Sequence, residues 1–293
     1  MLDTENKAGL VRMRFDLQRW LNAVTQQKGR AAVMGILNVT PDSFSDGGRF
    51  NSLDSVKGQV ELMELAGVDM FDVGGESTRP GAEAVSLQEE LDRVLPAIEW
   101  IAQNSSKPIS IDTYKPEVMR QAVLTGASLI YDVYALQAEG ALQMAKEMAV
   151  PVCVMHKKGV PKTMQDQPYY QDVVAEVKAF LKQRVEACEQ AGIAKKDILI
   201  DLGFGFGKRF EDNTLLFKNI EQFSGLGCEM LVGVSRKRMF RDIVGTDDIQ
   251  ERLIPSVTAT VLASQKGAKL VRVHDVLQTV QALDTLRYLV DSE

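Results

Sequence analysis

The chain has 293 residues, of which 45% are hydrophobic, so it can bury a large core, and α/β barrels of this size often form one domain. Its formal net charge of -6 argues against a general nucleic-acid or anionic-membrane surface, and no run of about 18 apolar residues predicts a membrane span. Three widely spaced cysteines form neither a disulfide framework nor a zinc pattern, and two histidines are too few for a multi-histidine metal site.

We therefore expect no nucleic-acid partner, no membrane partner and a reduced, cytoplasmic setting. The first residues have no signal-peptide core. We divide the chain into an N-terminal extension, residues 1–30, and a main domain, residues 31–293. Within the extension, apolar residues at helical spacing predict a short helix over residues 16–27 that caps the bottom of the fold.

The main domain alternates short apolar strands with helical stretches. Strands are predicted over residues 33–39, 69–73, 108–111, 128–133, 151–155, 198–202, 230–234 and 269–273. Helices are predicted over residues 53–66, 86–103, 116–124, 140–148, 170–191, 212–222 and 250–266, with a last helix ending near residue 289. Strands buried on both faces of a parallel sheet are nearly all apolar. Eight such units predict a TIM (β/α)8 barrel; a doubly wound open sheet is the alternative, although it rarely needs eight regular units.

The stretch over residues 33–50 is a strand that runs into a long polar loop. Asn38 stands at the strand end. The loop over residues 40–48 is predicted to be a mobile flap, because Pro41 stiffens one end and Gly47 and Gly48 free the other. Such a flap would close over the bound substrates and exclude water.

Ionisable or polar side chains stand at or just after the end of each strand, where a TIM barrel places its active site. In strand order these are Asn38; Asp72, Glu76, Thr78 and Arg79; Asp112; Asp132; His156; Asp201 and Lys208; Ser235, Arg236 and Lys237; and Arg272 and His274. A single Asp after a strand is as often the N-cap of the next helix, and a single His is more often a core residue. The whole set is harder to explain in that way, because all its members would face one mouth.

Two kinds of chemistry are present in this set. The cations that could meet an anion are Arg79, Lys237, Arg272 and His274. Asp112 and Asp201 could accept hydrogen bonds from the ring edge of a heterocycle, or pair with Lys237. Glycines alternate with Phe204 and Phe206, which brings backbone and aromatic rings close to a ligand. These residues predict a barrel enzyme for an anionic, flat substrate, but they do not fix the reaction.

Seven collinear motifs resemble those of the dihydropteroate synthase family over about residues 32–290. They are GILNVTPDSFSDGG (35–48), DVGGESTRPGA (72–82), SIDT (110–113), VCVMH (152–156), GFGFGK (203–208), VGVSRK (232–237) and VRVHDV (271–276). The resemblance implies a Mg²⁺-dependent transferase of folate biosynthesis. It would join 7,8-dihydropterin-6-ylmethyl diphosphate to 4-aminobenzoate, lose pyrophosphate before the aniline nitrogen attacks, form a homodimer and bind sulfonamides.

The resemblance also implies roles for particular residues. The pterin would be held by Asp112, Asp132, Met155, Asp201, Phe206, Gly233 and Lys237. The diphosphate would be held by Asn38, Arg79, Arg272 and His274, with Asn38 a ligand of Mg²⁺. The aminobenzoate site would be lined by Thr78, Arg79, Pro80, Phe206, Ser235 and Lys237. The catalytic residues would be Asp112, Lys237, Arg272 and His274.

The chain departs from the family's pattern at three places. Tyr131 replaces an asparagine that reads the pterin edge; it could bond through its hydroxyl, point elsewhere or block the pocket. Leu202 replaces a proline, and Lys157 and Lys158 add charge to the family's HxQG. Tyr131 leaves open a non-catalytic or regulatory pterin-binding homologue as the alternative, and a pterin-binding methyltransferase acting with a corrinoid protein is a third hypothesis. The last helices could supply the dimer interface or belong to the core (Val257, Val261, Leu283, Leu286 and Leu289).

Overall fold

The computed structural model describes residues 14–40, 48–77, 84–159 and 168–290; for residues 48–52 only the backbone is described. Eight parallel strands close into a barrel in sequence order, so the predicted TIM barrel is confirmed. The strands are β1 (Ala32–Asn38), β2 (Met70–Gly74), β3 (Ile109–Asp112), β4 (Leu129–Asp132), β5 (Val152–Met155), β6 (Ile198–Asp201), β7 (Glu229–Val232) and β8 (Leu270–Val273).

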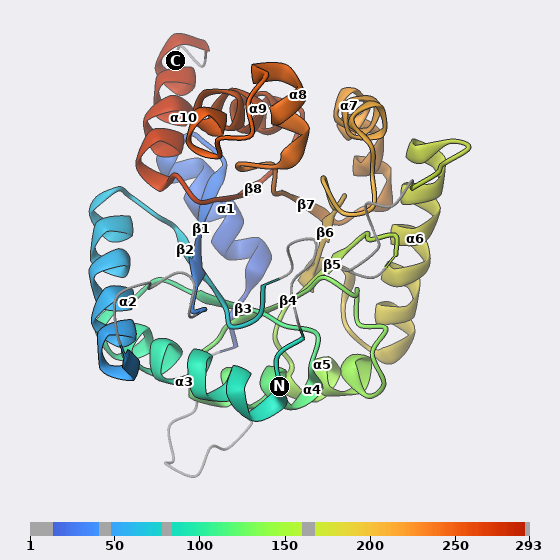
Figure 1. The fold of residues 1–293 in the computed structure, drawn as a ribbon. Helices are drawn as coiled ribbons and strands as arrows, with labels where there is room; N and C mark the ends of the chain where they lie inside the picture. Colours follow the sequence, from blue (N-terminus) through green and yellow to red (C-terminus); the bar gives the residue numbers. More distant parts are fainter. Residues whose placement is uncertain (1–13, 41–47, 78–83, 160–167, 291–293) are drawn as a thin grey trace.

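Helices surround the strands as an outer ring (Figure 1). They are α1 (Leu17–Lys28), α2 (Gly48–Leu65), α3 (Leu87–Asn104), α4 (Pro116–Thr125), α5 (Ala141–Met148), α6 (Val173–Ala191), α7 (Phe210–Lys218), α8 (Arg241–Val244), α9 (Leu253–Gln265) and α10 (Val276–Val290). Short 3-10 turns are η2 (Lys195–Asp197), η3 (Ile220–Leu226), η4 (Arg238–Phe240) and η5 (Gln250–Arg252). No helix among these described segments is both long and apolar enough to span a membrane.

Four predicted helices differ from the structure by two or more residues. Helix α2 begins at Gly48 rather than at residue 53. The other three differences have local reasons. Helix α6 begins at Val173 rather than residue 170, because the Asp172 side chain accepts the N–H groups of the first turn. Helix α7 begins two residues early, where Arg209 and Asp212 form a capping box, and it ends at Lys218 before η3. The helix predicted from residue 250 starts as the 3-10 turn η5, and α8 was missed because it has only four residues.

The apolar side chains form two layers that follow the strand alternation. One cluster lies between the strands and the helices, with members such as Val33, Phe71 and Ile111. The other fills the barrel interior, with members such as Met34 and Met70. The interior is therefore packed, and the strand ends are held in fixed positions above it.

Helix α1 closes the N-terminal end of the barrel. Leu17 and Leu21, four residues apart on one helix face, are 0% and 1% exposed and belong to the interior cluster with Ala32 and Leu270. The predicted capping helix is thus present, and it contributes side chains to the interior of the barrel.

Replacement of Leu21 by alanine is expected to lower the free energy of unfolding by about 2–5 kcal/mol, because it opens a cavity in a packed interior. Urea unfolding followed by circular dichroism measures the loss. Gln18→Ala, on the exposed face of the same helix, is the matched control. A loss below about 1 kcal/mol for Leu21→Ala would show that α1 does not pack as described.

Candidate active site

The strand register brings the predicted site residues to one end of the barrel. Asn38 pairs with Gly74 across β1 and β2, and Gly74 pairs with Asp112 across β2 and β3. Asp112 then pairs with Tyr131 on β4. On the other side, Met155 of β5 pairs with Asp201 of β6. These residues therefore stand at similar heights around the C-terminal mouth.

Arg272 of β8 joins two carboxylates across the barrel. Its Nε lies 2.6 Å from Asp72 Oδ2, and its Nη2 lies 2.8 Å from Asp112 Oδ2. Burial raises the pKa of Asp112 to about 7, even though Arg272 opposes the shift. Asp112 Oδ1 is buried and accepts no hydrogen bond from the described residues. This oxygen can accept a hydrogen bond from a ligand.

A small pocket adjoins this pair and has the predicted ring-binding residues as its walls. It is lined by Tyr131, Met155, Asp201, Phe206, Gly233, Lys237 and Arg272, among others. Asp201 Oδ1 accepts the N–H of Gly203 at 2.7 Å, and burial raises the pKa of its carboxyl group. Lys237 Nζ lies 4.1 Å from the centre of the Phe206 ring. The structure therefore brings five of the residues predicted to hold the pterin into one pocket: Met155, Asp201, Phe206, Gly233 and Lys237. Asp112, predicted with them, is not among the walls of this pocket.

A larger cleft opens beside the small pocket, with a volume of about 530 Å³. It is basic on balance, because its cations outnumber its carboxylates, which are Glu76, Asp112 and Asp247. Its cationic side chains are Arg236, Lys237, Arg238, Arg241, Arg252 and Arg272, and its other polar walls include Asn38, Asp112, Ser235 and His274. Several of these arginines were not predicted. The high density of basic residues from Arg236 to Arg241 could have indicated a basic cleft. Arg252 could not be found in this way, because it lies eleven residues further along the chain.

His274 meets the cleft as a neutral ring rather than as the predicted cation. Burial, followed by the charges of Arg272, Arg236 and Lys237, lowers its pKa to about 3. Its Nδ1 lies 3.1 Å from Ser235 Oγ, and the Ser235 hydroxyl also accepts the backbone N–H of His274. His274 therefore takes part by hydrogen bonding rather than as a charged group.

This lowered pKa predicts a pH-dependent difference in stability between the protein and its His274→Gln variant. The pKa is 6.5 for a free histidine and about 3 in the fold, so the unfolded chain binds the proton first and stability is lost as the pH falls below 6.5. Between pH 7 and pH 5 the parent should lose about 2 kcal/mol relative to the variant. Urea unfolding at both pH values measures this, and an unchanged difference would contradict it.

Asp132 was predicted to bind the pterin, and the structure does not bring it into the pocket. Its two carboxylate oxygens accept the backbone N–H groups of Tyr134 at 2.6 Å and Leu136 at 2.9 Å. Tyr131 points into the barrel with the interior cluster, so the alternation of the strand turns Asp132 to the outer side. Asp132 therefore fixes the loop after β4, which is the capping role that a lone Asp often has.

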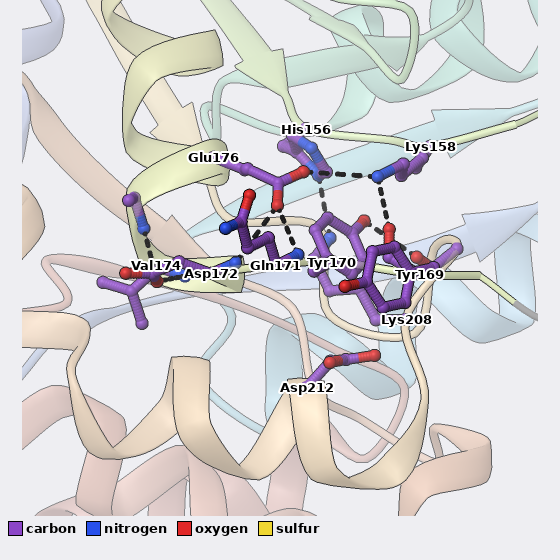
Figure 2. Close-up of polar contacts among 12 residues, drawn as sticks. His156, Lys158, Tyr169, Tyr170, Gln171, Asp172, Val174, Glu176, Lys208 and Asp212 are labelled. Carbon is purple, nitrogen blue, oxygen red and sulfur yellow. Dashed lines mark hydrogen bonds and ion pairs between the residues drawn. The ribbon is translucent and has the colours of Figure 1, made fainter.

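His156 and Lys208 lie beneath the loop after β6 rather than on the walls of the cleft. Lys208 Nζ donates to the carbonyl of Gly203 at 2.7 Å and lies 2.9 Å from His156 Nδ1, near Tyr170 (Figure 2). A Cβ on Gly203 would lie 1.8 Å from the carbonyl oxygen of His156, so only glycine fits there. These residues hold the loop that carries Phe206.

The two lysines that depart from the family's pattern have separate surroundings. Lys158 donates to the carbonyl of Tyr169 and pairs with Glu176 at 3.3 Å, so it lies against α6 (Figure 2). Lys157 Nζ lies 3.1 Å from the centre of the Tyr134 ring. Neither lines the basic cleft.

Thr78, Arg79 and Pro80 lie outside the described residues, as does most of the predicted flap over residues 40–48. Their predicted roles stay predictions. Asn38 is on the cleft wall, and no group of three or more His, Cys, Asp or Glu side chains in the described part of the chain could hold a metal ion. Mg²⁺ at phosphate sites takes few protein ligands and completes its shell with water and substrate phosphates. One amide oxygen on the wall of a basic cleft fits that kind of site.

Comparisons with known proteins agree with this geometry. A family profile described as pterin binding enzyme matches residues 34–274. The dihydropteroate synthase of Escherichia coli is 51% identical over 252 residues, which are 86% of this chain and 89% of the relative.

Two solved structures superpose closely. The Xanthomonas albilineans dihydropteroate synthase with 4-aminobenzoic acid has a TM-score of 0.86 and 47% identity, covering 91% of this chain and 95% of that one. The Yersinia pestis enzyme in a sulfonamide drug complex has a TM-score of 0.85 and 44% identity, covering 90% and 96%.

The barrel, its mouth of carboxylates and cations, and the matched profile define the class as a pterin-binding enzyme on a (β/α)8 scaffold. Sequence identity of 44–51% over most of both chains assigns the protein to one family within this class. The chain belongs to the dihydropteroate synthase family.

Proposed function

We propose that this protein condenses 7,8-dihydropterin-6-ylmethyl diphosphate with 4-aminobenzoate to give 7,8-dihydropteroate and pyrophosphate in folate biosynthesis. The observation that carries the proposal is the division of the mouth into two neighbouring parts: a small pocket whose Asp201 carboxylate can accept hydrogen bonds from a ring edge, and a basic cleft suited to a diphosphate. The reaction needs both in one site. The non-catalytic alternative and the corrinoid-linked methyltransferase are not favoured, because the relatives matched over most of the chain are synthases.

The ring of the pterin would bind between Asp201, Lys237 and Met155, with Phe206 and Gly233 as further walls. A carboxylate accepts hydrogen bonds from adjacent ring N–H groups, and Asp201 is held in place by the N–H of Gly203. An added Cβ on Gly233 would lie 3.7 Å from Asp201 Oδ2, so the glycine keeps this side of the pocket open. Asp132 is no longer part of this proposal.

The diphosphate would lie in the basic cleft against Arg272, His274, Asn38 and Arg79. Breaking the bond between the methylene carbon and the diphosphate oxygen leaves its electron pair on pyrophosphate, and these donors stabilise that charge. Asn38 would be the protein ligand of Mg²⁺, which would supply further neutralisation of the leaving group. Asp112 would face the positive charge that develops on the pterin.

The aniline nitrogen of 4-aminobenzoate would then attack the methylene carbon with its lone pair, and the C–N bond forms with loss of one proton. Ser235, Lys237 and Phe206 would line its site together with Thr78, Arg79 and Pro80. Sulfonamides would compete for the same space; a relative at 44% identity has been solved in a sulfonamide drug complex.

A homodimer in the cytoplasm is part of the proposal. All three cysteines are free thiols, which suits a reducing compartment. Of the residues considered for an interface, Leu283 is 1% exposed and belongs to the core, whereas Leu289 is 76% exposed. Tyr288 and Ile254, on α10 and α9, are also largely exposed. These exposed side chains would contribute to the surface on which a second copy packs.

The experiment mixes the purified protein with Mg²⁺ and both substrates, then measures pyrophosphate and dihydropteroate. We expect equal amounts of the two products when both substrates are present, no dihydropteroate when either substrate is left out, and a strong decrease when EDTA removes the metal. Bound pterin with no pyrophosphate release would contradict the proposed activity and favour the non-catalytic homologue.

A further inference from the structure

Tyr131, the residue that departs from the family's pattern, is one of the walls of the ring pocket. Its side chain is 2% exposed and points into the barrel. The hydroxyl lies 2.8 Å from Asp201 Oδ2 and 3.1 Å from Met155 Sδ. The guanidinium of Arg272 lies 5.0 Å from the centre of its ring. Tyr131 thus contacts two of the side chains that were expected to hold the pterin, Asp201 and Met155.

The Tyr131 hydroxyl donates a hydrogen bond to Asp201 Oδ2, an acceptor that a ring N–H of the substrate would otherwise use. Asp201 Oδ1 accepts the N–H of Gly203, and Asp201 Oδ2 accepts the Tyr131 hydroxyl. Burial, and then the charge of Asp201, raises the pKa of Tyr131 well above its ordinary value. The hydroxyl therefore remains a proton donor at physiological pH, as a ring N–H would be.

The volume that remains is too small for a bicyclic ring. The pocket holds about 30 Å³ of free space, whereas pockets for drug-sized ligands have about 300–1,000 Å³. The adjoining basic cleft, at about 530 Å³, shares Phe206, Lys237 and Arg272 with it as walls. The cleft has room for a diphosphate and an aminobenzoate, but the ring subsite is filled by the protein's own side chain.

We infer that Tyr131 closes the pterin subsite of the unliganded protein, so that the ring binds Asp201 only after the tyrosine side chain has moved aside. This inference rests on the proposed function and concerns its affinity for the first substrate. Moving Tyr131 breaks its bond to Asp201 and its packing under Arg272, and this opposes pterin binding. Tyr131 therefore lowers the affinity of the protein for the pterin ring.

The test measures binding of 6-hydroxymethylpterin, which has the ring but no diphosphate, by calorimetry. Tyr131→Asn should bind it at least tenfold more tightly than the parent. Tyr131→Phe, which keeps the ring but not the hydroxyl, should lie between the two. Tyr134→Asn is the matched control, because Tyr134 packs on Tyr114 and does not line the pocket; its dissociation constant should equal the parent's.

Turnover gives a second readout that a merely structural role would not produce. In Tyr131→Asn the KM for the pterin diphosphate should fall about as much as the dissociation constant, while the KM for 4-aminobenzoate stays within twofold. If Tyr131→Asn does not fold, Tyr131→Phe alone should still bind the pterin at least threefold more tightly than the parent. Equal dissociation constants in the parent and every folded Tyr131 variant would overturn the inference.

Asp201→Asn separates this failure from a failure of the proposed function. If it abolishes binding of 6-hydroxymethylpterin while the Tyr131 variants bind like the parent, the pterin subsite stands and only the inference about Tyr131 is wrong. If neither the parent nor any variant binds the pterin, the proposed function is wrong, and the inference fails with it.

Discussion

Replacing Lys237 with alanine is expected to lower kcat/KM for dihydropteroate formation at least a hundredfold. Lys237 belongs to both spaces of the mouth: it lies over the Phe206 ring in the ring pocket and lines the basic cleft. Its charge also lowers the pKa of Asp201, against the effect of burial. Loss of one fixed donor at a site of developing charge typically costs 10² to 10³ in rate. Asp201→Ala should cost a similar factor.

Steady-state kinetics with each substrate varied in turn measures the loss. Lys218→Ala, an exposed lysine on α7, is the matched control and should retain the parent's rate. Near-ultraviolet circular dichroism checks that the variants are folded. If folded Lys237→Ala and Asp201→Ala both turn over at nearly the parent's rate, the ring pocket has been assigned to the wrong residues.

Arg272→Met is expected to lower the free energy of unfolding by about 3–5 kcal/mol as well as to abolish turnover. The arginine is the cation that Asp72, at 0% exposure, and Asp112 share across the barrel. Without it, two buried carboxylates face each other, and one must take up a proton or accept the cost of an unpaired charge. The same side chain lines the basic cleft, so the diphosphate loses a donor too.

A second variant separates the two effects. Arg272→Met combined with Asp72→Asn removes one of the stranded charges, so it should recover a large part of the lost stability but none of the activity. For both variants, urea unfolding measures the free energy of unfolding, and the pyrophosphate assay measures turnover. A single Arg272→Met variant with the parent's stability would show that the three groups do not form the buried ion pair described above.

The sequence predicted the barrel and all its strands to within two residues, because strand alternation and apolar runs are local signals. It also identified Asp112, Asp201, Lys237 and Arg272 as side chains of one mouth. The partners within that mouth were not predictable, since Asp72 and Arg272 are 200 residues apart and meet only when the barrel closes. Asp132 caps the backbone after its strand, which was the alternative considered for a single Asp at a strand end. The alternation of side chains along β4 could have indicated this, because Tyr131 and Asp132 cannot both point inward.

Electrostatic states were the least predictable feature. His274 counts as a cation by residue type, yet burial beside three cations makes it neutral. His156 and Lys208 are adjacent in space and support a loop, although both were expected to face the mouth of the barrel. Tyr131 could be recognised as a departure from the sequence alone, but its hydrogen bond to Asp201 depends on the width of the finished barrel.

The central claim is that one chain holds a pterin ring in the Asp201 pocket and a diphosphate in the basic cleft beside it. The most direct test is a crystal structure with the pterin diphosphate bound. The account predicts the ring edge within hydrogen-bonding distance of Asp201 and Lys237, the diphosphate against Arg272 and His274, and Tyr131 turned away from Asp201. A ring bound elsewhere, with the Tyr131 hydroxyl still on Asp201, would contradict it.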